Sequence, residues 1–181
     1  MGEGAGRTAV IRPAERRDAE GIARVQVAAW RVAYAGIVSA AFLDGLDGAD
    51  RASRWRTRIG PAMRRDAPTF VAVDATDAVL AFAHTGPARD DDLDATTVGE
   101  IHTIYVDPIA WRRGIGASLM GAVDEFWRST EVRDLVVWVF DENADARAFY
   151  ERLGWRPDGA TEVDDFGDAH PLALRYRRQL V

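Results

Sequence analysis

The stretch GEIHTIYVDPIAWRRGIGASLM, residues 99–120, decides the fold prediction. Its first part predicts a β-strand that ends at Asp107-Pro108, and Gly114 and Gly116 open a helix behind it. Glycines let the backbone approach a ligand closely, and the first turn of a helix has N–H groups without intrahelical acceptors. Arg112 and Arg113 add positive charge directly before the first glycine. This junction predicts an anion-binding turn suited to a pyrophosphate.

The two glycines are weak evidence on their own, because a tight turn with a solvated arginine pair gives the same pattern. A dinucleotide-binding fold would have a third glycine where this chain has Leu119, and its motif would follow the first strand of the domain. Both conditions fail here. A dinucleotide-dependent enzyme is therefore disfavoured.

Hydrophobic periodicity predicts strands and helices on both sides of the turn. Asp18 is expected to cap the first helix, and Asp-Gly pairs divide the second helical stretch into two pieces. The expected elements are a strand at 9–12, a helix from 18 to about 35, two helical pieces within 39–58, hairpin strands at 69–73 and 78–85, an acidic loop at 89–97, a strand at 99–106, a helix at 114–129, a strand at 135–140, a helix at 144–153, and two last strands near 155 and at 172–178.

Three stretches together resemble the GCN5-related N-acetyltransferase (GNAT) superfamily over almost the entire chain. Residues 99–120 are similar to its cofactor motif, a strand ending in hydrophobic-Tyr-Val-x-Pro followed by [QR]-x-x-G-x-[GA] and a helix. DENADARAFYERLGW, residues 141–155, is similar to its Asn-x-x-x-x-x-x-Tyr pattern, and residues 11–34 are similar to its first strand and helix. Trp111 departs from the pattern, since the family usually has Gln or Arg there.

The resemblance implies an α/β fold, α+β by some schemes, with a central mixed, mostly antiparallel sheet flanked by helices. Strands four and five are expected to run parallel and to splay apart, often at a bulge in strand four, so that pantetheine lies between them like an added strand. Residues 1–181 are expected to form a single N-acetyltransferase domain, with residues 1–8 flexible.

The resemblance also implies acetyl-CoA as cosubstrate. An N–H of strand four would point at the acetyl oxygen, and backbone donors after it would hold the phosphates. The implied cofactor-binding residues are Ile104, Tyr105, Val106, Arg112, Arg113, Gly114, Ile115, Gly116, Ala117, Asn143 and Tyr150.

Attack by an alkylamine, whose pKa is about 10, requires a base for its proton and an acid for the departing thiolate. Tyr150 matches the family's tyrosine and is the predicted acid; a core aromatic is the simpler alternative. Glu100 matches the glutamate that one branch uses and is the predicted base. His102, on the same strand face, and a water molecule are the alternatives. The base of other branches would fall at Trp138, which cannot serve.

Substrate contacts in the resembling family come from the first helices and nearby loops. Trp30, Tyr34 and His102 are therefore candidate substrate residues, although core packing would equally explain Trp30 and Tyr34. Phe42 and the acidic residues Asp90, Asp91, Asp92 and Asp94 belong to the same region, where they would draw in a cationic amine or form a solvated loop. The expected acceptor is a small-molecule or peptide amine.

Composition excludes several other chemistries. The chain has no cysteine and only three scattered histidines, so no metal is expected. Its 23 basic residues are all arginine, which excludes mechanisms that need a lysine amine. A net charge of -6 makes nucleic acid a poor partner, and no apolar run predicts a membrane span or signal peptide. A cytoplasmic monomer or homodimer is expected. The alternative function is a non-catalytic acyl-CoA-binding or sensing protein of the same fold.

Overall fold

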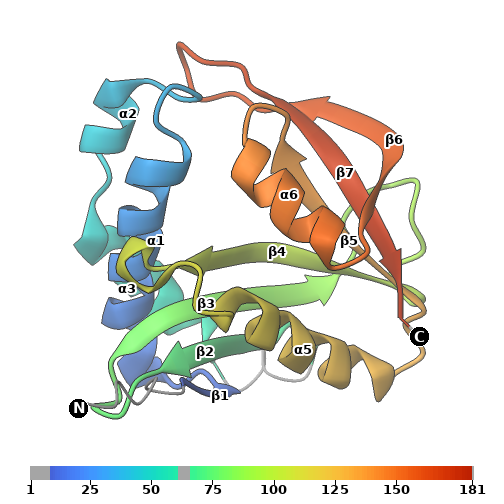
Figure 1. The fold of residues 1–181 in the computed structure, drawn as a ribbon, viewed down its shortest axis with the longest axis horizontal. Helices are drawn as coiled ribbons and strands as arrows, with labels where there is room; N and C mark the ends of the chain where they lie inside the picture. Colours follow the sequence, from blue (N-terminus) through green and yellow to red (C-terminus); the bar gives the residue numbers. More distant parts are fainter. Residues whose placement is uncertain (1–8, 61–65, 181) are drawn as a thin grey trace, which may run out of the picture.

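The computed structural model describes residues 9–60 and 66–180, and these residues form one seven-stranded sheet flanked by helices (Figure 1). The expected flexibility of residues 1–8 lies outside the described residues. The strands are β1 (Val10–Pro13), β2 (Thr69–Val73), β3 (Val79–Pro87), β4 (Val98–Val106), β5 (Asp134–Phe140), β6 (Arg156–Val163) and β7 (Leu172–Gln179). The helices are η1 (Arg16–Asp18), α1 (Ala19–Ala33), α2 (Ala40–Asp44), α3 (Gly48–Arg58), η2 (Pro108–Ala110), α5 (Ile115–Arg128) and α6 (Ala144–Arg152).

The strand order across the sheet is β1-β2-β3-β4-β5-β7-β6. β4 and β5 pair in parallel, whereas the other neighbouring strands of the described chain pair antiparallel. This arrangement confirms the predicted mixed, mostly antiparallel α/β fold. The ranges predicted from periodicity agree with the observed elements to within a few residues, and the helical stretch at 39–58 is divided into α2 and α3 as expected.

Two hydrophobic clusters cover the two faces of the sheet. On one face Leu119 and Val123 of α5 pack with Ile101 of β4 and Val137 of β5. On the other face Ile22 and Val25 of α1 and Trp55 of α3 pack with Val71 and Phe82. Burying one such side chain contributes about 1.5–3 kcal/mol to folding. Helices therefore pack on both faces of the sheet, and β4 is the central strand of the seven.

β4 and β5 separate halfway along their length. Their pairing runs from Val98 opposite Asp134 to Ile101 opposite Val137 and ends there, although β4 continues to Val106 and β5 to Phe140. The register between β3 and β4 shifts at the same level, because Thr103 pairs with His84 while Ile101 pairs with Thr85. His102 is therefore the extra residue of a β-bulge, which bends the strand locally. This is the splay and bulge that the sequence predicts.

The start of α1 differs from the prediction. Asp18 precedes the helix, but its side chain makes no capping hydrogen bond to α1. Its carboxylate instead accepts hydrogen bonds from the Arg12 guanidinium at 2.7 and 2.9 Å and from the Glu15 N–H at 2.7 Å. A nearby guanidinium offers a charge-assisted bond that outcompetes the helix N–H groups. In the described part of the chain no helix is both long and apolar enough to span a membrane.

Candidate active site

The turn between β4 and α5 is open to solvent and has an unusual backbone. Gly114 has a φ of 77° and occupies the N-cap position of α5 without any side-chain capping bond. Arg112 also lies in the left-handed region, with a φ of 61°. The side chains of Arg112 and Arg113 are exposed. The first N–H groups of the 14-residue helix α5 therefore face outward beside two cations, which is a suitable environment for a phosphate group.

The free edge of β4 is continuous with this turn. The N–H of Asp107 donates to the Leu80 carbonyl at 2.8 Å, in register with the β3–β4 ladder. Because antiparallel ladders alternate, Tyr105 and Thr103 direct their backbone groups to β3, whereas Ile104 and Val106 direct theirs toward the separated strand β5. The splay thus leaves the N–H groups of Ile104 and Val106 without a strand partner, while Tyr105 contributes its side chain to the other face.

Trp111, the departure from the family motif, holds the end of β4. Its indole Nε1 donates a hydrogen bond to the Val106 carbonyl at 2.8 Å. The ring is 37% exposed, so part of it is open to solvent. This hydrogen bond ties the turn to the end of β4.

Tyr150 lies on α6 next to the separated strands and is almost fully buried, with 4% of its surface exposed. Its ring packs against Phe149, Trp155 and Tyr176. Burial raises the pKa of the Tyr150 phenol, and the nearby Tyr105 raises it further. The phenol is therefore protonated at neutral pH and can donate a proton. Asn143 begins the same helix, where its side-chain oxygen accepts from the Ala146 N–H at 3.1 Å.

Glu100 is buried and held by an arginine. Its carboxylate accepts hydrogen bonds from the backbone N–H and the Nε of Arg89, both at 3.1 Å, and from the Arg89 terminal nitrogen. Only 2% of the Glu100 side chain is exposed, against 65% for Arg89. The sequence prediction did not include this ion pair. Both oxygens of the Glu100 carboxylate therefore accept hydrogen bonds from Arg89.

His102 lies beside Glu100 at the bulge. Its Nε2 is 3.7 Å from Glu100 Oε2 and 3.3 Å from the Pro87 carbonyl oxygen. A carbonyl can only accept, so we assign the proton to Nε2, which leaves Nδ1 with a free lone pair. Burial lowers the pKa of His102, and Glu100 partly offsets this effect. His102 is therefore a neutral base at physiological pH, located where β4 and β5 begin to separate.

An aromatic cluster lies beside the separated ends of β4 and β5, which contribute Tyr105 and Phe140 to it. Trp30 and Tyr34 of α1, 5.1 Å apart between ring centroids, lie at its centre, and the Tyr34 hydroxyl is 3.0 Å from the Tyr105 hydroxyl. Four elements and the β6–β7 connection, which reaches toward α2 in Figure 1, contribute to this cluster. Its members are Trp30, Tyr34, Phe42, Tyr105, Phe140 and Phe166.

The acidic residues after β3 do not form a free anionic loop. Asp90 and Asp92 bind the guanidinium of Arg175 at 2.9 and 2.7 Å, and Asp158 binds it from β6 at 2.8 Å. Arg175 is 5% exposed, so its charge requires these partners. Asp90 and Asp92 are therefore held by Arg175, although the Asp92 side chain is 63% exposed and so remains in contact with solvent.

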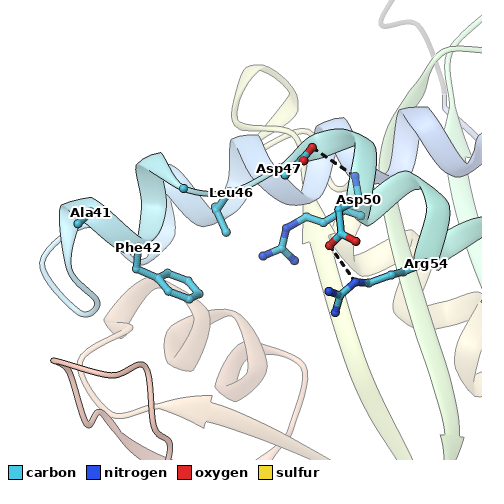
Figure 2. A pocket seen from close by; sticks show the side chains of 8 residues that line it. Ala41, Phe42, Leu46, Asp47, Asp50 and Arg54 are labelled. Carbon is cyan, nitrogen blue, oxygen red and sulfur yellow. Dashed lines mark hydrogen bonds and ion pairs between the residues drawn. The ribbon is translucent and has the colours of Figure 1, made fainter.

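A cavity of about 340 Å³ lies between α2 and α3, next to the aromatic cluster. Figure 2 shows Phe42 of α2 extending toward Asp50 and Arg54 of α3, which form an ion pair at 2.9 Å. Asp47 accepts from the N–H groups of Ala49 and Asp50 and so caps α3. Arg51 also lines this cavity. Its guanidinium carbon is 4.7 Å from the centroid of the Trp30 ring.

Comparison with known proteins decides the family. The family model described as "Acetyltransferase (GNAT) family" matches residues 32–155, well over half of the chain. The chain belongs to the GNAT acetyltransferase family. The turn between β4 and α5 and the splay between β4 and β5 both fall within the matched range, and as a member of this family the chain is an acetyltransferase enzyme.

Individual relatives and solved structures agree with this assignment. The chain is 29% identical over 133 residues to the uncharacterized N-acetyltransferase YuaI of Bacillus subtilis, covering 74% of this chain and 72% of the relative. It is 30% identical over 108 residues to the peptidyl-lysine N-acetyltransferase YjaB of Salmonella typhimurium, covering 59% and 63%. The PaiA N-acetyltransferase of Thermoplasma acidophilum, solved with coenzyme A, shares the fold with a TM-score of 0.72 at 16% identity, covering 95% of this chain and 99% of that one.

Several residues around the acetyltransferase site were missed by the sequence reasoning. Arg89 is the single basic residue within 69–108, and that isolation in an acidic stretch was a usable signal. Arg175 alternates with the core residues Leu174 and Tyr176, which indicated that it faces the opposite side of the sheet. Phe166 lies in a polar loop, where no local pattern indicated its contact with Trp30.

Proposed function

We propose that this acetyltransferase transfers an acetyl group from acetyl-CoA to a primary amine of a small molecule or peptide. The observation that carries the proposal is the gap between β4 and β5, which opens directly next to the phosphate-binding turn. A relative named for peptidyl-lysine acetylation and a fold neighbour solved with coenzyme A support this type of reaction. A monomer or homodimer that does not bind nucleic acid remains our prediction.

In this proposal acetyl-CoA binds along the free edge of β4. The phosphates contact Arg112, Arg113 and the backbone of residues 114–117, and the pantetheine amides pair with Ile104 and Val106. Tyr105 lines the acceptor side, and Asn143 and Tyr150 approach the thiol end of the cofactor arm. A strand-four N–H stabilises the oxyanion as the amine nitrogen attacks the thioester carbonyl.

Two proton transfers complete the reaction. The carbon–sulfur bond breaks as the new carbon–nitrogen bond forms, and the Tyr150 phenol donates its proton to the departing thiolate. The sequence hypothesis names Glu100 as the base. Since Arg89 occupies the Glu100 carboxylate, we propose that His102 Nδ1 accepts the amine proton and that Glu100 stabilises the resulting imidazolium.

The experiment measures free thiol release from acetyl-CoA over a panel of amines. We expect His102→Gln and Tyr150→Phe each to lower kcat by about 10²–10⁴-fold on the best acceptor, as expected for loss of a general base or acid. Glu100→Gln should lower kcat less than His102→Gln. Equal or larger loss in Glu100→Gln would return the base role to Glu100, and unchanged turnover in all three variants would contradict both assignments.

A non-catalytic acyl-CoA-binding protein is the second candidate function. The ion pair between Arg89 and Glu100 favours it, because Arg89 occupies the carboxylate that the sequence hypothesis names as the base. In that case acetyl-CoA would raise the melting temperature, while no acceptor would stimulate thiol release. Release of thiol that depends on an acceptor amine excludes this candidate.

A further inference from the structure

Arg51 of α3 lines the cavity between α2 and α3, and no carboxylate lies within ion-pair distance of it in residues 9–60 and 66–180. The neighbouring Asp50 pairs with Arg54 at 2.9 Å, and Asp47 caps the helix backbone. Arg51 is partly buried, and this burial lowers the pKa of its guanidinium. The guanidinium lies over the face of the Trp30 ring.

A guanidinium in this position has unused binding capacity. It carries five N–H donors in a planar fork that matches a carboxylate, while a cation–π contact engages only its face. Two arginines line the cavity, and Arg54 already pairs with Asp50, whereas Arg51 has no carboxylate partner among the described residues. The cavity of about 340 Å³ that Arg51 lines is within the size range of small-ligand pockets, about 300–1,000 Å³.

The charges on the two sides of the aromatic cluster are opposite. Arg58 lies two helical turns after Arg51 and has no carboxylate partner in the described chain. Burial lowers the pKa of His102, and the charge of Arg58 lowers it slightly further. On the β6–β7 side, burial raises the pKa values of Glu162 and Asp164. Asp164 is close enough to contribute, after burial, to the raised pKa of Tyr34. Arginines thus lie on the α3 side of the aromatic cluster, where Arg51 contacts Trp30, and carboxylates lie on its β6–β7 side.

A ligand with one positive and one negative charge would complement the carboxylates of the β6–β7 side and the arginines of α3. Its ammonium group would enter on the β6–β7 side and would lose a proton to His102 before attack. Its acid group would then point away from β4 toward α3 and the cavity. A simple polyamine would leave Arg51 without a partner and would bring a second cation close to it.

We propose that the acceptor of the acetyl group is an amine that carries its own carboxylate, as an amino acid does, and that this carboxylate binds Arg51 in the cavity between α2 and α3. The inference rests on the proposed acetyl transfer and names the substrate class. Arg51 in this view is a specificity-determining residue.

The test compares L-amino acids with their carboxamides, which keep the amine and side chain and lose the negative charge. We expect kcat/KM for the best amino acid to exceed that for its carboxamide by about tenfold or more, the usual range for a charge-assisted hydrogen bond. In Arg51→Gln the KM for the amino acid should rise by about 10–100-fold, while the KM values for the carboxamide and for acetyl-CoA stay unchanged.

Arg56→Gln is the matched control. Arg56 lies on the same helix, pairs with Glu20 and lines a different cavity, so this variant should keep the wild-type preference. The melting temperature of each variant with and without acetyl-CoA verifies folding and cofactor binding.

The outcomes separate the two proposals. Turnover of carboxamides as efficient as that of the amino acids, or equal losses for both in Arg51→Gln, would overturn the role of Arg51 while leaving acetyl transfer intact. Absence of acceptor-dependent thiol release with every amine would overturn the proposed function itself, and the substrate class with it.

Discussion

At the scale of single residues, replacing glycine by alanine should change stability in opposite directions at two positions, Gly114 at the N-cap of α5 and Gly121 within the helix. A Cβ atom added at Gly114 or at Gly121 would meet no other atom within 4 Å. The two positions differ in backbone alone, because Gly114 has a φ of 77° and Gly121 lies inside the helix. Any difference between the two alanine variants therefore reports the backbone conformation and not packing.

We predict that Gly114→Ala lowers the free energy of unfolding by about 1–2 kcal/mol, because an L side chain is strained in the left-handed region. Gly121→Ala should raise it by about 0.5–1 kcal/mol, because alanine loses less entropy in a helix. Urea denaturation of both variants checks the pair. Two changes of the same sign would mean that the turn before α5 rearranges when Gly114 is replaced.

His84 predicts a pH dependence of stability. It is 3% exposed, its Nδ1 lies 3.0 Å from Thr69 Oγ1, and burial lowers its pKa to about 3. Between that value and the ordinary value of about 6.5, the unfolded chain binds a proton that the folded chain does not. Stability should therefore fall by about 1.4 kcal/mol per pH unit as the pH decreases below 6.5.

His84→Asn tests this dependence, since asparagine can keep the bond to Thr69 but does not titrate. Denaturation curves at pH 7 and pH 5 should show a smaller loss of stability in the variant than in the wild type. Equal losses would assign the acid sensitivity to other groups.

At the scale of elements, the position of β4 in the sequence could be predicted, but the tertiary contacts of its side chains could not. Alternation, Asp107-Pro108 and the glycines predict the strand, the turn and the helix, because those signals are local. The ion pair between Arg89 and Glu100 and the packing of Phe166 on Trp30 depend on tertiary contacts across distant elements. The isolation of Arg89 in an acidic stretch indicates that it pairs with a carboxylate, but no spacing in the sequence identifies Glu100 as the partner or Trp30 as the contact of Phe166.

The Arg89–Glu100 pair makes an asymmetric prediction. Arg89→Gln leaves a carboxylate that is 2% exposed without its cation and should cost about 1–3 kcal/mol of stability. Glu100→Gln leaves Arg89, 65% exposed, in contact with water and should cost less. Chemical denaturation of the two single variants and the double variant measures the coupling. Equal costs would indicate that Glu100 has a second cationic partner.

At the scale of the whole molecule, the sheet is assembled as two parts that meet along a short pairing. β1 to β4 form one part and β5 to β7 the other, joined between Val98 and Ile101 of β4 and their β5 partners. The aromatic cluster adds contacts between α1 and the β6–β7 connection. A ligand that lies between β4 and β5 contacts both parts and should therefore stabilise the whole fold.

We predict that acetyl-CoA at one hundred times its Kd adds about 2.7 kcal/mol to the free energy of unfolding, as ligand linkage requires. Thermal unfolding with acetyl-CoA, and with adenosine diphosphate as a phosphate-bearing control, measures the effect. The control should give a smaller shift because it reaches the turn but not the gap. Equal shifts in melting temperature for the two ligands would mean that the pantetheine arm does not contribute to binding.

The free edge of β4 also determines how fast backbone hydrogens are replaced by deuterium. Thr103 and Tyr105 direct their N–H groups to β3 and are protected, whereas those of Ile104 and Val106 lack a strand partner beyond Ile101. In the free protein, slow and rapid exchange should therefore alternate residue by residue in the middle of the sheet. When pantetheine occupies the gap, the two rapid positions become slow, and the seven strands exchange as though an eighth had been added.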